Sequence, residues 1–156
     1  MKVFLTIIVC ILILIIILLL ICIKIIFGLL KEKNEHIGKV NRNFLFLNEW
    51  MDKKRDNPER MKNNLISKNC SRVAVYGAGY LGFQLYRELQ KNSIEVVCFI
   101  DKSRTETCLD IPFYSLQDQM PDIDAIIISL VYSHNVIERD IKKVFKGEIL
   151  FLEELI

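Results

Sequence analysis

The stretch "VAVYGAGYLG", from Val73 to Gly82, decides the fold of this chain. Its first four residues are almost wholly apolar, as in a strand that is covered on both faces. The pattern G-x-G-x-x-G follows at once, and a segment with leucines at helical spacing comes directly after it. A strand, a glycine-rich turn and a helix in this order are typical of a dinucleotide-binding fold. The stretch therefore predicts an α/β sheet with a binding site at its first turn.

Each glycine of this turn has its own expected role. Gly77 makes the tight turn, Gly79 lets phosphate oxygens approach the backbone, and Gly82 lets the helix pack closely on the strand. An acidic residue about 20 positions further on accepts hydrogen bonds from a ribose in such sites, and Asp101 lies 19 residues after Gly82. The predicted nucleotide contacts are Gly77, Ala78, Gly79, Tyr80, Leu81, Gly82, Asp101 and Lys102. The alternative is that the glycines serve packing alone and that Lys102 belongs to a solvated turn.

The sequence after Arg72 alternates short apolar runs with longer amphipathic runs. We expect strands at 72–76, 95–100, 111–114, 125–130 and 148–152, and helices at 80–91, 115–119 and 135–146. Such alternation predicts a Rossmann-like α/β domain over residues 72–156, with a parallel sheet of about five strands. Right-handed crossovers give these strands the order 3-2-1-4-5.

The N-terminal region is apolar enough to cross a membrane. Residues 3–23 carry no charge, and a run of this length spans about 30 Å as a helix. A cleaved signal peptide has a shorter apolar region and a small-residue cleavage site, so we predict a retained transmembrane anchor over residues 1–30. Basic residues follow the run at Lys24, Lys31, Lys33, Lys39 and Arg42, whereas only Lys2 precedes it. This asymmetry predicts a single-pass protein of the cell membrane with a cytoplasmic C-terminal domain.

Charge is divided unevenly along the rest of the chain. Residues 31–72 carry 11 Lys and Arg against 6 Asp and Glu, whereas residues 73–156 carry 8 against 13. A basic segment beside the anchor suits an anionic membrane surface. The acidic domain argues against nucleic acid as a partner, because nucleic-acid binding requires a basic face. The two histidines lie far apart and no Cys-x-x-Cys occurs, so no metal site is predicted.

Residues 31–71 are predicted to form a juxtamembrane amphipathic helix and a linker. A stripe with 3-4-3-4 spacing consists of Ile37, Val40, Phe44, Leu47 and Met51, and Leu45, Phe46 and Trp50 widen it. The preferred interpretation is that this stripe packs on its own domain; contact with the membrane interface and pairing with a second copy remain open. The helix should end near Asp56. Asn57 should then cap a short helix with Pro58 at its first position and Met61, Leu65 and Ile66 facing inward.

Residues 72–156 resemble a known group of domains through "RVAVYGAGYLGFQLYRELQKNSIEVVCFIDKS", "IPFYSLQD" and "IDAIIISL". The group is the small Rossmann-like nucleotide-binding domains of bacterial surface-polysaccharide machinery. It includes the first domain of membrane-bound nucleotide-sugar dehydratases and epimerases, and the N-terminal domain of sugar acyltransferases. The resemblance implies NAD or a nucleotide sugar as the ligand, with Gly77, Gly79, Gly82 and Asp101 at nucleotide-contacting positions.

The chain departs from the enzymes of that group. It has no Tyr-x-x-x-Lys pair, no second catalytic Rossmann domain and no hexapeptide repeat. We therefore expect a membrane-anchored regulatory or adaptor module that binds a nucleotide or nucleotide sugar, rather than an enzyme. One alternative is an NAD-dependent epimerase- or dehydratase-like enzyme completed by a partner chain, and another is a ligand-free scaffold. The expected partners are the membrane and either a polysaccharide-synthesis enzyme or a second copy.

Overall fold

The computed structural model describes residues 2–102, 111–131 and 134–156, with side chains at all of these positions except 2–11 and 134. The chain divides into two compact units, Met1–Arg42 and Asn43–Ile156. The second unit therefore begins well before Arg72 and includes residues that the sequence placed in the juxtamembrane segment. Each unit is described by itself.

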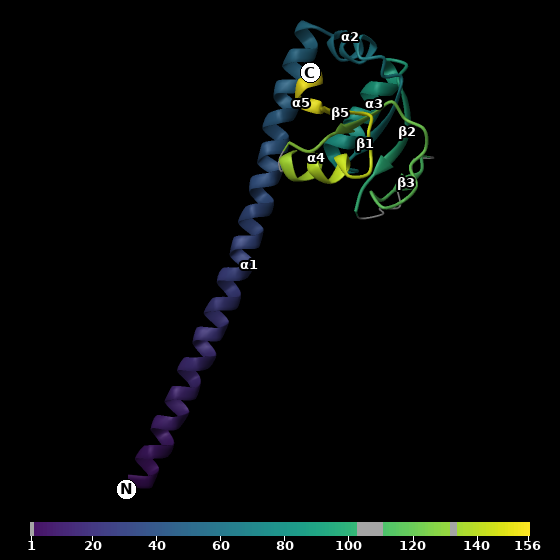
Figure 1. The fold of residues 1–156 in the computed structure, drawn as a ribbon. Helices are drawn as coiled ribbons and strands as arrows, with labels where there is room; N and C mark the ends of the chain where they lie inside the picture. The colour runs from purple at the N-terminus through teal and green to yellow at the C-terminus, as the bar shows by residue number, and fades with distance from the viewer. Residues whose placement is uncertain (1, 103–110, 132–133) are drawn as a thin grey trace. The chain divides into compact units, whose positions relative to one another are not determined.

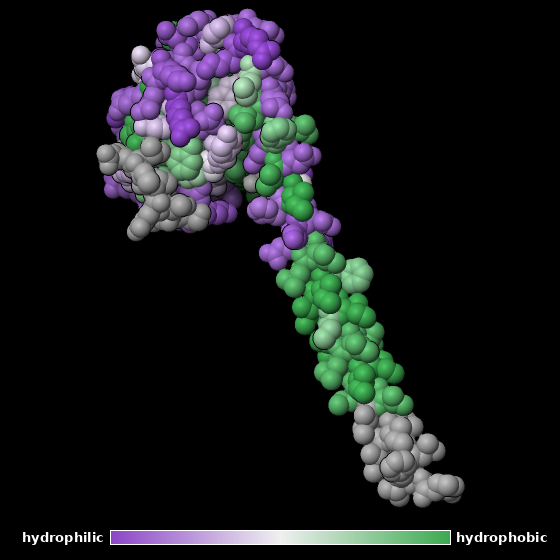
Figure 2. Space-filling view, turned by 180° about the vertical axis from the view of Figure 1, so that it is seen from behind, coloured by the Kyte–Doolittle hydropathy of each residue, from purple (hydrophilic) through white to green (hydrophobic). Residues whose placement is uncertain are grey.

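The first unit consists of the greater part of one long helix. Helix α1 runs from Lys2 to Asp56, a length of 55 residues, and the first unit ends at Arg42. Between Leu12 and Leu30 the isoleucine, leucine and phenylalanine side chains are all exposed, and Figure 2 shows this part of the helix as a hydrophobic surface. A helix that is apolar all round needs an apolar environment. The helix is long and apolar enough to cross a membrane, a property that a membrane anchor and a signal sequence share.

The second unit is built on a parallel sheet of five strands (Figure 1). The strands are β1 (Arg72–Tyr76), β2 (Glu95–Ile100), β3 (Phe113–Tyr114), β4 (Ala125–Ile128) and β5 (Glu148–Phe151). Their order is β3-β2-β1-β4-β5, and all neighbours are parallel. The predicted fold class and strand order are thus confirmed, and β1 lies at the centre, where the chain changes direction across the sheet.

Helices cover both faces of this sheet. Besides the end of α1, they are α2 (Arg60–Ser67), α3 (Tyr80–Lys91), α4 (His134–Lys142) and the short α5 (Leu152–Leu155). Alternate residues of β1 point to opposite faces. Val73 and Val75 pack in a core with side chains of α1, α2, α3 and α5, whereas Ala74 and Tyr76 pack in a second core with Ile141 of α4. The near-continuous apolar strands of the sequence therefore reflect burial on two sides.

The predicted helix over residues 115–119 is absent, and the chain makes a turn there instead. The Asp118 carboxylate accepts a hydrogen bond from the amide of Ser115 at 2.7 Å, and the Asp118 amide donates to the Ser115 carbonyl at 3.1 Å. The bond from the Ser115 amide to the Asp118 carboxylate is one half of the capping box that starts many helices. Pro121 prevents propagation, because the residue before a proline disfavours the helical conformation.

The end of α1 packs on its own domain, as the sequence predicted, but through only part of the widened stripe. Phe46 and Trp50 are buried at 8% and 6% exposure and belong to the larger core, and Leu47 is half-buried against it. Phe44 and Met51, in contrast, are 59% and 58% exposed. The domain thus covers the side of the widened stripe on which Phe46 and Trp50 lie, and these two aromatic side chains remove a large apolar surface from water.

The prediction for the start of α2 was also wrong in detail. The helix begins at Arg60 after Glu59, and no side-chain hydrogen bond caps it among the described residues. Asn57 contributes only its carbonyl oxygen, which accepts from the Arg60 amide at 3.3 Å. Met61 and Leu65 are buried as expected, whereas Ile66 is 56% exposed. A helix of eight residues presents a narrow apolar face, so only the positions four apart reach the core.

The start of β1 is held by the carboxylate of Asp124, which precedes β4. Its Oδ2 atom accepts hydrogen bonds from the amides of Ser71 and Arg72, each at 2.8 Å, and from the Ser71 hydroxyl at 3.2 Å. These bonds, led by that from Arg72, lower the pKa of Asp124 below its ordinary value. A carboxyl group whose pKa is lower in the folded state stabilises the fold above its unfolded-state pKa, and this contribution disappears as the pH falls through the folded-state value.

We expect Asp124→Asn to lower the melting temperature at pH 7, and the difference from wild type to narrow as the pH falls from about 5 to about 3. Thermal unfolding followed by circular dichroism over this range measures the difference. Asp122→Asn is the control, because its side chain is 97% exposed and its one described partner is Arg72. A difference that does not change with pH would contradict the role assigned to the Asp124 charge.

Candidate functional site

The candidate site is the turn that joins β1 to α3 at the carboxyl edge of the sheet. Gly77 opens it with a φ of +99°, a conformation that residues with a side chain rarely adopt. Its amide donates to the carbonyl of Ile100 at 2.9 Å, which extends the pairing of β1 with β2 by one residue. A Cβ atom on Gly77 would lie 2.9 Å from the Ser129 hydroxyl oxygen and 3.3 Å from Leu130. Both the backbone angle and the packing therefore require glycine here.

Gly82 is required for a different reason. A Cβ atom built on it would lie 1.9 Å from the carbonyl oxygen of Gly77, far inside the van der Waals contact of carbon and oxygen. The obstacle is backbone, so no side-chain rearrangement relieves it. The first turn of α3 thus packs directly against the backbone of the preceding turn, as the sequence predicted for the last glycine of the motif.

Gly79 differs from both, because nothing in the described structure requires it to be glycine. Its φ of −86° and ψ of −171° are accessible to any residue, and a Cβ atom built on it would meet nothing within 4 Å. Gly79 is the N-cap of α3, and no side chain among the described residues caps this helix. The open position therefore lies at the end of a helix whose first amides have no side-chain acceptor, an environment that favours an anion.

Asp101 lies against the turn, where the sequence predicted it. It follows β2 directly, and its amide donates to the carbonyl of Tyr114 at 3.0 Å. Its Oδ2 atom accepts a hydrogen bond from the amide of Ala78 at 2.7 Å. One carboxylate oxygen thus helps to hold the turn in shape, and a half-buried acidic group stands beside the position where a phosphate would bind.

The other predicted contacts have unequal access to a ligand. Tyr80 is 64% exposed and Lys102 is exposed, so both side chains are accessible from solvent. Leu81 is buried at 4% and packs in the larger core, which leaves only its backbone for a ligand. Arg104 and Cys108, which follow Asp101 in the sequence, lie outside the described residues, as does the side chain of His134.

Ser129 is part of the site and was missed by the sequence analysis. It follows β4 and is 1% exposed. Its hydroxyl lies within donor distance of the carbonyls of Tyr76 and Gly77, at 3.0 and 3.1 Å, and its amide donates to Tyr76 at 3.0 Å. Ser129 therefore stabilises the turn through its hydrogen bonds to the carbonyls of Tyr76 and Gly77. The signal in the sequence is a single hydroxyl within the otherwise apolar "DAIIISL", because a buried polar group requires a partner.

Two described ionisable groups beside the turn, Tyr76 and Asp140, have shifted pKa values. Burial raises the pKa of Tyr76, and the charges of Asp101 and Asp140 raise it further, so the phenol stays protonated at neutral pH. A hydrogen bond with Lys143 lowers the pKa of Asp140, which keeps that carboxylate charged. Among the described residues no cluster of histidine, cysteine and acidic side chains could hold a metal ion.

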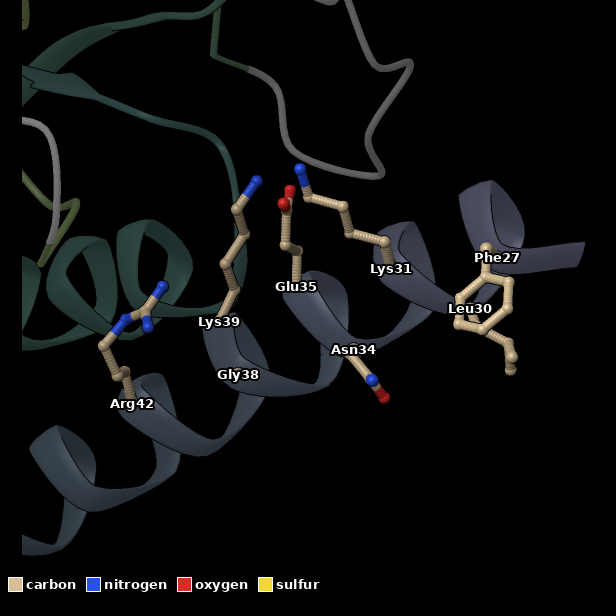
Figure 3. A pocket seen from close by; sticks show the side chains of 8 residues that line it. All are labelled: Phe27, Leu30, Lys31, Asn34, Glu35, Gly38, Lys39 and Arg42. Atoms are coloured by element: carbon tan, nitrogen blue, oxygen red, sulfur yellow. The ribbon is translucent and has the colours of Figure 1, made fainter. Parts of the chain in front are cut away.

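A second candidate is the basic stretch of α1 in the first unit (Figure 3). The side chains of Lys31, Glu35 and Lys39 extend from one side of the helix, whereas Asn34 points away from them. Phe27 and Leu30 form the apolar end of this stretch. The Arg42 guanidinium lies near Gly38: a Cβ atom built on Gly38 would be 3.7 Å from it. An apolar end next to basic side chains is typical of a helix at the boundary between lipid and water.

Comparisons with sequence models of protein families, with curated proteins and with solved structures find no match to this chain.

The three glycines predict different responses to the same substitution. We expect Gly82→Ala to lower the free energy of unfolding by about 3 kcal/mol or more, because the clash is with backbone. Gly79→Ala should cost about 1 kcal/mol or less, because the space is open and only N-cap preference changes. Urea unfolding of the full chain in detergent measures both. Equal losses in the two variants would show that Gly79 also serves packing.

Proposed function

We propose that this chain is a membrane-anchored module that binds a nucleotide or a nucleotide sugar at the turn between β1 and α3. The observation that carries the proposal is the contrast among the glycines. Packing and backbone angle account for Gly77 and Gly82, but among the described residues neither accounts for Gly79, whose missing side chain leaves space at a helix start without a side-chain cap. A pyrophosphate that approaches the backbone there is the ligand for which such a glycine is suited.

The neighbouring groups extend this proposal to the sugar of the nucleotide. The Asp101 carboxylate lies beside the turn, through its bond with the Ala78 amide, at the position that contacts a ribose in related folds. A ribose diol can donate to it, whereas a 2′-phosphate would set like charges against each other. We therefore favour NAD, or the nucleotide part of a nucleotide sugar, over NADP. Lys102 is an exposed side chain, whereas the Asp101 carboxylate is fixed at the end of a strand. Lys102 should therefore not reverse this preference.

The proposed role is regulatory or that of an adaptor, rather than catalytic. Among the described residues around the turn are a protonated phenol and paired carboxylates but no poised base, and the sequence has no Tyr-x-x-x-Lys pair. The resemblance of residues 72–156 to nucleotide-binding domains of surface-polysaccharide synthesis supports a nucleotide sugar as the signal and an enzyme of that synthesis as the partner. The second possibility, a scaffold with an empty turn, is supported by the part that Asp101 and Ser129 play in shaping the turn.

The proposal places the C-terminal unit on the cytoplasmic side of the cell membrane. Its support is the exposed apolar surface of α1 between Leu12 and Leu30, followed by basic side chains at Lys31, Lys39 and Arg42. Positively charged residues that follow a transmembrane helix remain on the cytoplasmic side. Nucleotides and nucleotide sugars are present there, so the site and its ligand would share a compartment.

The binding test uses two substitutions at one position. Aspartate and serine are both good N-cap residues, so Gly79→Asp and Gly79→Ser should leave α3 as stable as before. The aspartate, however, places a negative charge where the pyrophosphate would bind. In calorimetry with the full chain in lipid nanodiscs, we expect NAD or a uridine nucleotide sugar to bind in the range of tens of micromolar or weaker, because the site is open. Gly79→Asp should weaken binding at least about tenfold more than Gly79→Ser.

The same titrations separate the two candidate functions. NADP should bind more weakly than NAD, and coenzyme A serves as a nucleotide of different shape. If none of these ligands binds at millimolar concentration to the wild-type chain, the turn serves packing and the scaffold is the correct function. If a ligand binds but Gly79→Asp and Gly79→Ser affect it equally, it binds elsewhere on the domain.

Two measurements test the anchor: the fraction of the cell in which the chain is found, and whether its N-terminal residues have been removed. We expect a C-terminally tagged chain to remain in the membrane pellet after a carbonate wash, with its N-terminal residues intact by mass spectrometry. Protease added to intact spheroplasts should leave the tag, and protease added after lysis should remove it. A shortened chain in the soluble fraction would identify residues 1–30 as a signal sequence, and removal of the tag from intact spheroplasts would reverse the orientation.

A further inference from the structure

The end of α1 carries an apolar stripe that its own domain leaves uncovered. Phe44 and Met51 are 59% and 58% exposed, and the half-buried Leu47 lies between them on the same side of the helix. The domain contacts the adjacent side, through Phe46 and Trp50. Figure 2 shows hydrophobic surface on α1 where the helix belongs to the domain. Three apolar side chains in line, at spacings of three and four residues, are more than scattered surface exposure requires.

We propose that this stripe is a dimer interface, formed with the same stripe of a second copy in a parallel two-helix coiled coil. The positions 44, 47 and 51 are the a, d and a positions of a heptad repeat. The sequence continues the repeat backwards through Val40 and Ile37, which are 56% and 55% exposed in the first unit. Five consecutive seam positions are therefore apolar. In a two-fold dimer each side chain meets its own counterpart, so Phe44 faces Phe44 and Met51 faces Met51.

The charges of the helix favour an identical partner. The e and g positions that flank the seam between Val40 and Met51 are Asn41, Asn43, Asn48 and Trp50, and none of them is charged. Such positions set partner choice in coiled coils through opposite charges. The charged residues in this interval, Arg42 and Glu49, occupy f positions on the far side of the helix. Two copies of this surface therefore meet without repulsion between like charges. A partner recognised through its charges would find no oppositely charged residue at these positions.

Leu47 and Met51 also line a groove together with Arg87 and Lys91 of α3. The parallel orientation follows from the proposed anchor, because two copies that enter the same bilayer in the same direction present their stripes in register. Confinement in one membrane also raises the effective concentration of each copy for the other. The interface does not depend on whether the glycine turn holds a nucleotide.

The test places a photo-crosslinking amino acid, benzoylphenylalanine, at single positions of the full chain in native membranes. We expect irradiation to give a dimer from position 44 and from position 51. Position 45 is the matched control, because Leu45 is 58% exposed and apolar but lies at a b position outside the seam. Coexpression of two differently tagged copies, followed by capture of one tag and detection of the other, identifies the adduct as a homodimer.

A second measurement changes the seam without changing the fold. The double variant Phe44→Glu, Met51→Glu sets like charges across the proposed seam, so the fraction of chain recovered as heterotagged dimer should fall on the order of tenfold. Leu45→Glu should leave this fraction unchanged, and all variants should keep the wild-type circular dichroism spectrum, because the replaced side chains are exposed in the single chain. Equal crosslinking at positions 44, 45 and 51, adducts with lipid alone, or adducts with a different protein would each overturn the proposal.

Discussion

The contact between Gly82 and the carbonyl of Gly77 is the constraint on which the domain depends. It lets the first turn of α3 pack against the backbone that leaves β1, at a separation that a single added methyl group would make impossible. From this contact α3 lies over one face of the sheet and buries Leu81, Leu85 and Leu89 against the central strand. The same contact fixes the start of α3, where Gly79 is the N-cap. The packing of the domain and the candidate site therefore have a common origin.

The groups that surround this contact hold the turn before any ligand arrives. Asp101 accepts from the Ala78 amide, Ser129 bonds to the carbonyls below, and Gly77 continues the pairing with β2. A turn that is fixed in advance loses little conformational entropy when a ligand binds. The same bonds also explain why a glycine-rich turn alone is weak evidence of binding, since each of them stabilises the fold. Gly79 is informative because it takes part in none of these described contacts.

The second structural feature of the molecule is the use of one helix for two purposes. The apolar run of α1 is suited to lipid, whereas its last turns contribute Phe46 and Trp50 to the core of the domain. Burying two aromatic side chains contributes several kcal/mol, roughly 1.5–3 kcal/mol each, so this end of α1 is part of the folded domain rather than a linker. Any fragment that begins at the first strand would lack part of its core, together with Met61 and Leu65 of α2.

Much of the architecture followed from the sequence by itself, because its signals are local. The bounds of β1, β2 and α3, the strand order and the position of Asp101 beside the glycine turn were all predicted from apolar runs, glycine spacing and the handedness of crossovers. Only the tertiary structure decided which face of α1 is buried, since periodicity shows that a helix has an apolar face but not which neighbour covers it. It also decided that residues 115–119 stop after one turn, that Ser129 supports the site, and that Gly79 is free of packing contacts. Each of these depends on residues that are distant in the sequence or on the balance between competing local preferences. A pattern read along the chain shows neither the distant contacts nor the outcome of that balance.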